Sequence, residues 1–167
     1  MNKRVLIIII SFLLLSIIPA FSCFNIALAN DLKVTYESVN PNSETKYKLK
    51  RLSEKLQGTY IKIFKKNQVI SHSAKLANRR FVELVYVVEK DEVNYLETAT
   101  SRYMTHIGLL KEKIESNDQQ HLDIKDNFIN QPEVLSWLRD KHPSQTAEWL
   151  FLQQAVDTAN VLISDLD

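Results

Sequence analysis

The chain has 167 residues, of which 45% are hydrophobic and 25% charged, and its formal net charge is +1. This length suits a single domain, and this composition can bury a core, which excludes wholesale disorder. Only 2 glycines and 4 prolines occur, which argues against all-β folds with many tight turns and against glycine-rich phosphate loops.

The first 29 residues have the pattern of an export signal. Lys3 and Arg4 precede an apolar run over 5–20, and the small residues Ala27 and Ala29 then stand at the two positions that signal peptidase reads. We therefore predict a cleaved signal peptide over 1–29 and an exported product, periplasmic or extracellular.

Two alternatives remain open for this segment. The apolar run is close to the roughly 20 residues that cross a bilayer, so the chain is alternatively membrane-anchored by residues 5–21 and faces outward. The other alternative is a lipoprotein cleaved before Cys23. Cleavage after Ala29 removes this sole cysteine, so the exported chain would have no disulfide and no thiolate metal ligand.

The exported part is expected to begin with an extended leader over 30–43, and Ser43 or Thr45 is a candidate helix N-cap. A first helix is predicted over 44–65. Its apolar face repeats every three or four residues and consists of Leu49, Leu52, Leu56, Tyr60 and Ile63. Gly58 weakens this pattern by about 1 kcal/mol relative to alanine, so a kink or an early end of the helix near Gln57 is one alternative.

Two longer helices are predicted next, over 68–89 and 92–116. The apolar positions of the former are Ile70, Ala74, Ala77, Phe81, Leu84 and Val88, and those of the latter are Val93, Leu96, Thr100, Tyr103, Ile107, Leu110 and Ile114. Spacings that alternate between three and four are typical of antiparallel, coiled-coil-like packing. The β-branched residues in 84–88 would also suit a buried strand, but the unbroken repeat favours a helix.

The periodicity weakens after a break at 116–118. A helix is expected over 119–128, followed by a segment that has Pro132 in its first turn and ends near Lys141. Pro143 then precedes a last helix over 144–164. The core side of this last helix is predicted to hold Ala147, Leu150, Phe151, Ala155, Ala159, Leu162 and Ile163.

These elements predict an all-α fold, an antiparallel helical bundle of four to six helices. Residues 44–116 would form a helical hairpin core, and residues 117–167 would supply C-terminal helices that pack on the same bundle. Trp137, Trp149, Phe128 and Phe151 are expected to form an aromatic core in the C-terminal part. An exposed Trp137 would instead indicate a binding face.

Two stretches of the chain resemble a family of exported or membrane-tethered bacterial proteins, domain of unknown function 5667. Residues 47–57, Tyr-Lys-Leu-Lys-Arg-Leu-Ser-Glu-Lys-Leu-Gln, are similar to the opening motif of that family, and residues 76–83, Leu-Ala-Asn-Arg-Arg-Phe-Val-Glu, are similar to a later helix. Lys48 stands where the family usually has proline. The resemblance covers about residues 38–115 and implies a fold and a location but no active-site residues.

The charged residues in these two stretches form pairs at helical spacing. Lys50 with Glu54, and Arg79 with Glu83, are i,i+4 pairs, which stabilise exposed helices by a few tenths of a kcal/mol each. We interpret them as solvated support for the helices. The alternative is that Arg51 or Arg80 reaches a carboxylate on a neighbouring helix.

Charge is segregated along the chain. Residues 44–66 contain eight basic and two acidic residues, whereas residues 115–167 contain ten acidic and three basic ones. A candidate basic interaction face lies beside the leucines of the first predicted helix and consists of Lys48, Arg51, Lys55, Lys62 and Lys66.

Three interpretations of this face compete. It pairs with the acidic C-terminal helices, or it binds anionic lipid or wall polymer, or it docks a protein of the envelope. Membrane contact would also follow if the signal segment is retained. Nucleic acid is not an expected partner, because the domain as a whole is not basic, and the oligomeric state stays open.

No linear motif of a catalytic or metal site stands out. His72, His106, His121 and His142 lie on different segments without a recognised metal spacing, and each is expected to be a surface or helix-end histidine. One weak candidate for a divalent cation combines Asp118, His121, Asp123 and Asp126, but it lacks the glycine of a calcium loop. We therefore predict no catalytic residue, no metal and no cofactor.

The sequence thus predicts an exported, non-enzymatic helical interaction or structural module of the bacterial cell envelope. The alternative is a periplasmic helical sensor or chaperone-like protein that binds a small ligand or a metal ion.

Overall fold

The computed structural model describes residues 45–116 and 122–166. The signal peptide predicted over 1–29, the leader over 30–43 and the candidate cap Ser43 lie outside the described residues. The described residues form helices and contain no strand, so the prediction of an all-α helical bundle is confirmed. The alternative of a strand over 84–88 is wrong, because these residues continue a helix.

The three N-terminal helices begin and end close to their predicted bounds. They are α3 (Lys46–Phe64), α4 (Val69–Glu89) and α5 (Val93–Glu115), with a short 3-10 turn η1 (Lys66–Gln68) between the first two. Contrary to the alternative of an early end near Gln57, α3 continues through Gly58. Thr45 occupies the N-cap position of α3, but its side chain makes no capping hydrogen bond.

The C-terminal part contains α6 (Leu122–Phe128), α7 (Gln131–Arg139) and α8 (Ala147–Asp165). Pro132 lies in the first turn of α7, where its missing N–H costs nothing. α8 begins a few residues later than predicted, because the Thr146 side chain is the N-cap and accepts a hydrogen bond of 3.3 Å from the backbone N–H of Trp149.

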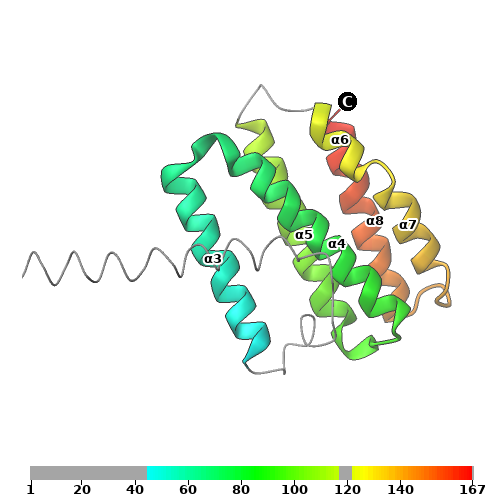
Figure 1. Ribbon diagram of the computed structural model, residues 1–167. Coiled ribbons are helices and arrows are strands. Elements are labelled where there is room, and N and C mark those ends of the chain that lie inside the picture. Colours follow the sequence, from blue (N-terminus) through cyan, green and yellow to red (C-terminus); the bar gives the residue numbers. More distant parts are fainter. Residues whose placement is uncertain (1–44, 117–121, 167) are drawn as a thin grey trace, which may run out of the picture. The chain divides into compact units, whose positions relative to one another are not determined.

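The core lies between a hairpin of α4 and α5 and the C-terminal helices. α4 and α5 contact each other most extensively, α8 packs on α5, and α7 packs on α8 (Figure 1). The predicted stripes of α4 and α5 supply much of this core. Its fully buried members include Ala77, Leu84, Tyr103, Ile107, Leu110, Phe128, Leu135, Leu138, Leu152 and Leu162.

The predicted core side of α8 needs a correction. Ala155, Ala159 and Leu162 are buried as expected, but Ala147 and Leu150 are exposed. Leu152 and Val156, absent from the prediction, are buried instead. Apolar residues surround much of α8, which packs on both α5 and α7, so the repeat alone did not define one inward side.

A polar contact fastens α7 to the hairpin inside the core. The Tyr103 hydroxyl donates to the Gln131 side-chain carbonyl at 2.9 Å, and the Gln131 amide donates to the Asn78 side chain at 3.1 Å. Burial raises the pKa of Tyr103, so the phenol stays a neutral donor. Tyr103 and Gln131 therefore satisfy each other's polar groups without water.

The turn between α4 and α5 is a Schellman motif. Glu92 N–H donates to the Val87 carbonyl at 2.9 Å, and Asp91 N–H donates to the Val88 carbonyl at 3.1 Å. Asp91 has a φ of 55°, in the left-handed region where glycine is the usual residue.

Replacing Asp91 with glycine is expected to raise the free energy of unfolding by about 0.5–1 kcal/mol, because glycine occupies this conformation without the Cβ clash. Urea unfolding of both proteins measures the difference. Asp91→Ala, which keeps the Cβ and removes the carboxylate, is the control and should not be stabilised. Equal stability of the glycine variant and the parent would contradict the expectation.

Candidate functional site

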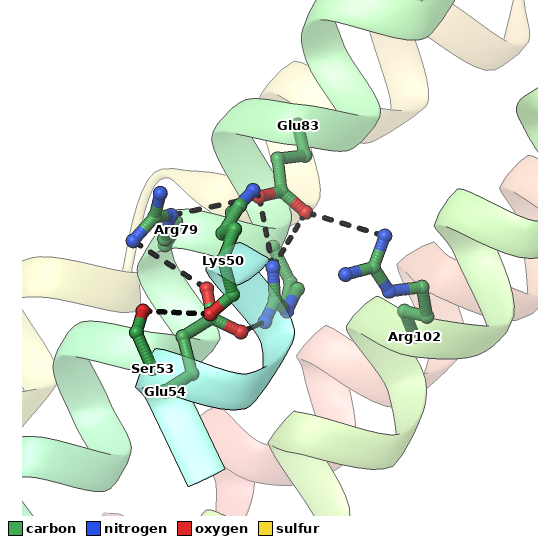
Figure 2. Close-up of polar contacts among 7 residues, drawn as sticks. Lys50, Ser53, Glu54, Arg79, Glu83 and Arg102 are labelled. Carbon is green, nitrogen blue, oxygen red and sulfur yellow. Dashed lines mark hydrogen bonds and ion pairs between the residues drawn. The ribbon is translucent and has the colours of Figure 1, made fainter. Parts of the chain in front are cut away.

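A cluster of six charged side chains lies where α3 packs on α4 (Figure 2). We call it the charge cluster. α3 contributes Lys50 and Glu54, α4 contributes Arg79, Arg80 and Glu83, and α5 contributes Arg102. Their side chains are between 3% and 18% exposed. Charges withdrawn from water to this extent must be paired closely, because desolvation of an isolated ion costs several kcal/mol.

Glu83 is the centre of the charge cluster. Arg80 Nη1 donates to its two carboxylate oxygens at 2.8 and 2.7 Å, and Lys50 Nζ donates to Oε1 from α3. Arg79 and Arg102 lie within 3.6 and 3.8 Å of the carboxylate. Burial opposes ionisation, but Arg80, Lys50 and Arg102 together lower the pKa of Glu83 below its usual value, so it is a carboxylate at neutral pH.

Arg80 connects this centre to α3. Its Nη2 donates to Glu54 Oε2 while its Nη1 holds Glu83, so one guanidinium bridges carboxylates of two helices. Although burial opposes the charged form, Glu83 and Glu54 raise the pKa of Arg80. Arg79 Nη1 lies 3.4 Å from Glu54 Oε1. The position of α3 on α4 is thus determined largely by charge.

Cations outnumber carboxylates four to two in the charge cluster. Burial lowers the pKa of Lys50, although Glu83 opposes this. Burial also lowers the pKa of Arg102, and the neighbouring Arg80 charge adds to it. The Arg102 guanidinium lies 5.1 Å from the centre of the Tyr47 ring, a cation–π contact that offsets part of its desolvation.

The role of the pairs at helical spacing was only partly anticipated. The interpretation of Lys50–Glu54 and Arg79–Glu83 as solvated surface support is wrong, because all four side chains are largely buried in the charge cluster. The alternative for Arg80 is confirmed, since it reaches Glu54 on the neighbouring helix. Arg51, named with it, is exposed and lies 6.0 Å from the Tyr47 ring.

The leucine face of α3 points away from the rest of the bundle. An apolar face of this periodicity is expected to pack against the bundle, but its members are between 38% and 63% exposed: Leu49, Leu52, Leu56, Tyr60 and Ile63. Phe64, 70% exposed, continues this row. The side of α3 that faces α4 instead holds the charge cluster with buried Tyr47 and Ile61. The physical reason is that the ions of α4 need partners from α3, and these lie opposite its leucines.

The five residues of the candidate basic interaction face are all exposed. Lys48, Arg51, Lys55 and Lys62 follow α3 in a row beside the leucines, and Lys66 follows in η1. Glu54, the one acidic residue within α3, belongs to the charge cluster. The exposed side of α3 therefore combines an apolar row with a basic row, and we call it the outer face of α3.

The interpretation that this basic helix pairs with the acidic C-terminal helices does not agree with the contacts. α3 packs on α4 and η1, and in Figure 1 the hairpin of α4 and α5 separates it from α7 and α8. The carboxylates of α4 and α3 itself supply the anions in the charge cluster.

The other candidates lie apart from this region. Of the possible cation ligands, Asp118 and His121 lie outside the described residues, nothing is described of the Asp123 side chain, and Asp126 is exposed. Among the residues that the structure describes, no group of three or more His, Cys, Asp or Glu side chains is placed to hold a metal ion.

Two of the aromatic residues that are predicted to lie in the C-terminal core differ in their burial. Phe128 is buried as expected, whereas Trp137 is 58% exposed, with Lys141 Nζ 3.5 Å from the centre of its ring. The prediction of Trp137 as a core residue is therefore wrong. Lys141 lies over the ring in a cation–π contact, and the alternative of a binding face at Trp137 stays a prediction.

His106 on α5 is half-buried near the charge cluster. Burial, with the positive charge of Arg80 next, lowers its pKa to about 4. The expectation of a surface or helix-end histidine is wrong at this position. The sequence held a signal for this placement, because His106 lies three positions after Tyr103 and four before Leu110, two members of the predicted apolar stripe.

This histidine predicts a pH dependence of stability. Between about pH 6.5 and pH 4 the unfolded chain protonates His106 but the folded chain does not, so stability is fully present above pH 6.5 and is lost as the pH falls toward 4. His72, whose pKa burial also lowers, acts in the same direction. Urea unfolding at about pH 7 and about pH 5 should show a smaller loss in His106→Gln than in the parent, and equal losses would contradict the assignment.

Comparison with known proteins adds no relative: no family model, curated protein or solved structure matches the chain. Within the described ranges, none of the helices combines the length and the apolar character needed to cross a membrane.

Proposed function

We propose that the chain is an exported, non-enzymatic interaction module of the bacterial cell envelope, and that the outer face of α3 is its contact surface. One observation carries this proposal: six large apolar side chains of one helix are exposed beside a row of exposed basic side chains. A contiguous apolar surface of this kind marks an interaction site.

The charge cluster, on the opposite side of α3, also supports the proposal. Through Lys50–Glu83 and Arg80–Glu54 it holds α3 on α4 without using the leucines, which stay available for a partner. We interpret the charge cluster as the support that fixes α3 on α4. Glu83, its central carboxylate, is surrounded by cations that lower its pKa, whereas a general acid at neutral pH needs a raised one.

Export and contact are tested together in cells that produce the tagged full chain. Mass spectrometry of the product should show an N-terminus at Asn30. A photoreactive amino acid at Leu56 should crosslink to an envelope component, and the same group at Leu150, which is 48% exposed on α8 against 56% for Leu56, should not. A cytoplasmic product that retains Met1, or equal crosslinking from both positions, would overturn the proposal.

A further inference from the structure

The exposed apolar residues of the described chain are concentrated on one helix. Six of the twelve exposed large hydrophobic residues belong to α3, and the others are spread over α5, α7, α8 and the turn after α6. Scattered apolar residues are normal on a protein surface, but a continuous row is not. α3 therefore exposes a continuous apolar surface, and this exposure to water is energetically unfavourable.

The basic row lies directly beside this apolar row. With 3.6 residues per turn, Lys48, Lys55 and Lys62 fall on a neighbouring strip of the same helix, and all three are exposed. A helix with an apolar strip next to lysines and arginines is typical of helices that lie in the surface of an anionic membrane. With 19 residues it is roughly 28 Å long and could lie flat along such a surface.

Charge complementarity favours an anionic membrane as the partner of this surface over two other candidates, a second copy of the chain and residues 1–44. A second copy that contacts the outer face of α3 with its own would add a second basic row and would give neither row a counter-charge. Residues 1–44 carry three basic and three acidic residues, so this segment offers no excess of negative charge to the basic row. An anionic bilayer offers both negative headgroups and an apolar interior.

We propose that the outer face of α3 binds the surface of a bilayer that contains anionic lipids, with the leucine row in the headgroup–acyl boundary and the basic row on the headgroups. This inference rests on the proposed function and names the partner of the same surface. The charge cluster holds the rest of the bundle on the opposite side of α3.

The test is sedimentation of the full chain with vesicles of phosphatidylcholine, with and without phosphatidylglycerol. Binding to pure phosphatidylcholine reports the apolar contributions, from the segment over 5–20 and from the leucine row, so the ratio between the two lipids reports the contribution of the basic row. The full chain is expected to partition more strongly into the anionic vesicles. Equal partitioning into both would overturn the inference.

Two pairs of variants locate this preference. Lys48→Gln with Lys55→Gln should weaken partitioning into anionic vesicles by about 25-fold, at roughly fivefold for each basic residue near the surface. The control Lys75→Gln with Lys90→Gln removes the same charge from exposed positions on and after α4 and should leave the ratio unchanged. An equal loss in both pairs would mean attraction by net charge alone and would overturn the assignment to α3.

The apolar row is tested by the partitioning itself and not by the ratio. Leu52→Gln with Leu56→Gln should weaken binding on the order of tenfold or more, while Leu150→Gln with Val161→Gln, both exposed on α8, should not. Each variant keeps its core, so thermal melts should match the parent. If the parent is a dimer and the Leu52/Leu56 variant is a monomer, a second copy of the chain occupies this surface, and the lipid inference is overturned.

The experiments distinguish a failure of the lipid inference from a failure of the proposed function. If the Leu56 photocrosslinker captures an envelope protein and the vesicle ratio is one, the interaction module stands and the lipid inference fails. If the product is not exported, the proposed function fails whatever the vesicles show.

Discussion

Replacing Glu83 with glutamine is expected to weaken the docking of α3 on α4 by about 3–5 kcal/mol, the usual cost of removing one partner from a buried ion pair. The amide cannot neutralise Arg80 or Lys50, both of which donate to this carboxylate. Burial already lowers the pKa of Lys50, and without Glu83 its charged form becomes more costly still. The charge cluster then carries four cations and one carboxylate.

The molecule has a simple way to relieve this cost, because α3 can leave the bundle. Tyr47 and Ile61 are its buried apolar residues, and neither belongs to the main core cluster. We therefore expect faster hydrogen exchange at the amides of α3 in Glu83→Gln, while those of α5 and α8 stay protected. A detached helix of this length is only marginally stable in water, so its amides would exchange almost freely.

A matched control removes a carboxylate that has no such role. Glu97 is exposed on α5, and Glu97→Gln should change stability by no more than about 0.5 kcal/mol. If α3 exchanges equally slowly in Glu83→Gln and in the parent, the charge cluster is not what holds the helix.

Replacing Leu84 with alanine is expected to lower the free energy of unfolding by about 2–5 kcal/mol. Leu84 is completely buried, at 0% exposure, in the contact between α4 and α5. Its removal loses transfer energy and leaves a cavity that the two long helices can close only in part. Unlike Glu83→Gln, this change should destabilise all helices together, because α4 and α5 form the centre of the core.

Thermal and urea unfolding, each followed by circular dichroism, measure this loss. Leu109→Ala is the control, since Leu109 lies on α5 and is 41% exposed, and it should cost far less. Melts of Leu84→Ala within error of the parent would contradict the core position of this residue.

The helices of the hairpin were predictable because their signal is local. In α4 and α5 the apolar residues recur every three or four positions without interruption, and the predicted bounds agree with the structure within a residue or two. The last helix was less well predicted, because it has apolar residues on more than one side. Its inward face, with Leu152 and Val156, depends on which neighbours it packs against.

In the candidate site, too, the residues themselves were easier to predict than their placement. Most of its residues could be found in the sequence, since the basic row and the pairs around Glu54 and Glu83 are visible there, but Arg102 of α5 was missed. Their placement could not, because Lys50 and Glu83 are 33 positions apart and Arg80 and Glu54 are 26 apart. The local periodicity predicts that the leucines face inward. It carries no information about buried charges on another helix that need partners of opposite charge.

The sequence by itself determined that these residues form helices, and where most of them begin and end, because helix formation follows largely from the spacing of apolar residues along the chain. Only the tertiary structure decided which side of α3 faces the bundle. Arg80 and Glu83 of α4 are buried where α3 packs on it, and leucines packed over these ions would leave them buried without the carboxylate and the ammonium that α3 supplies.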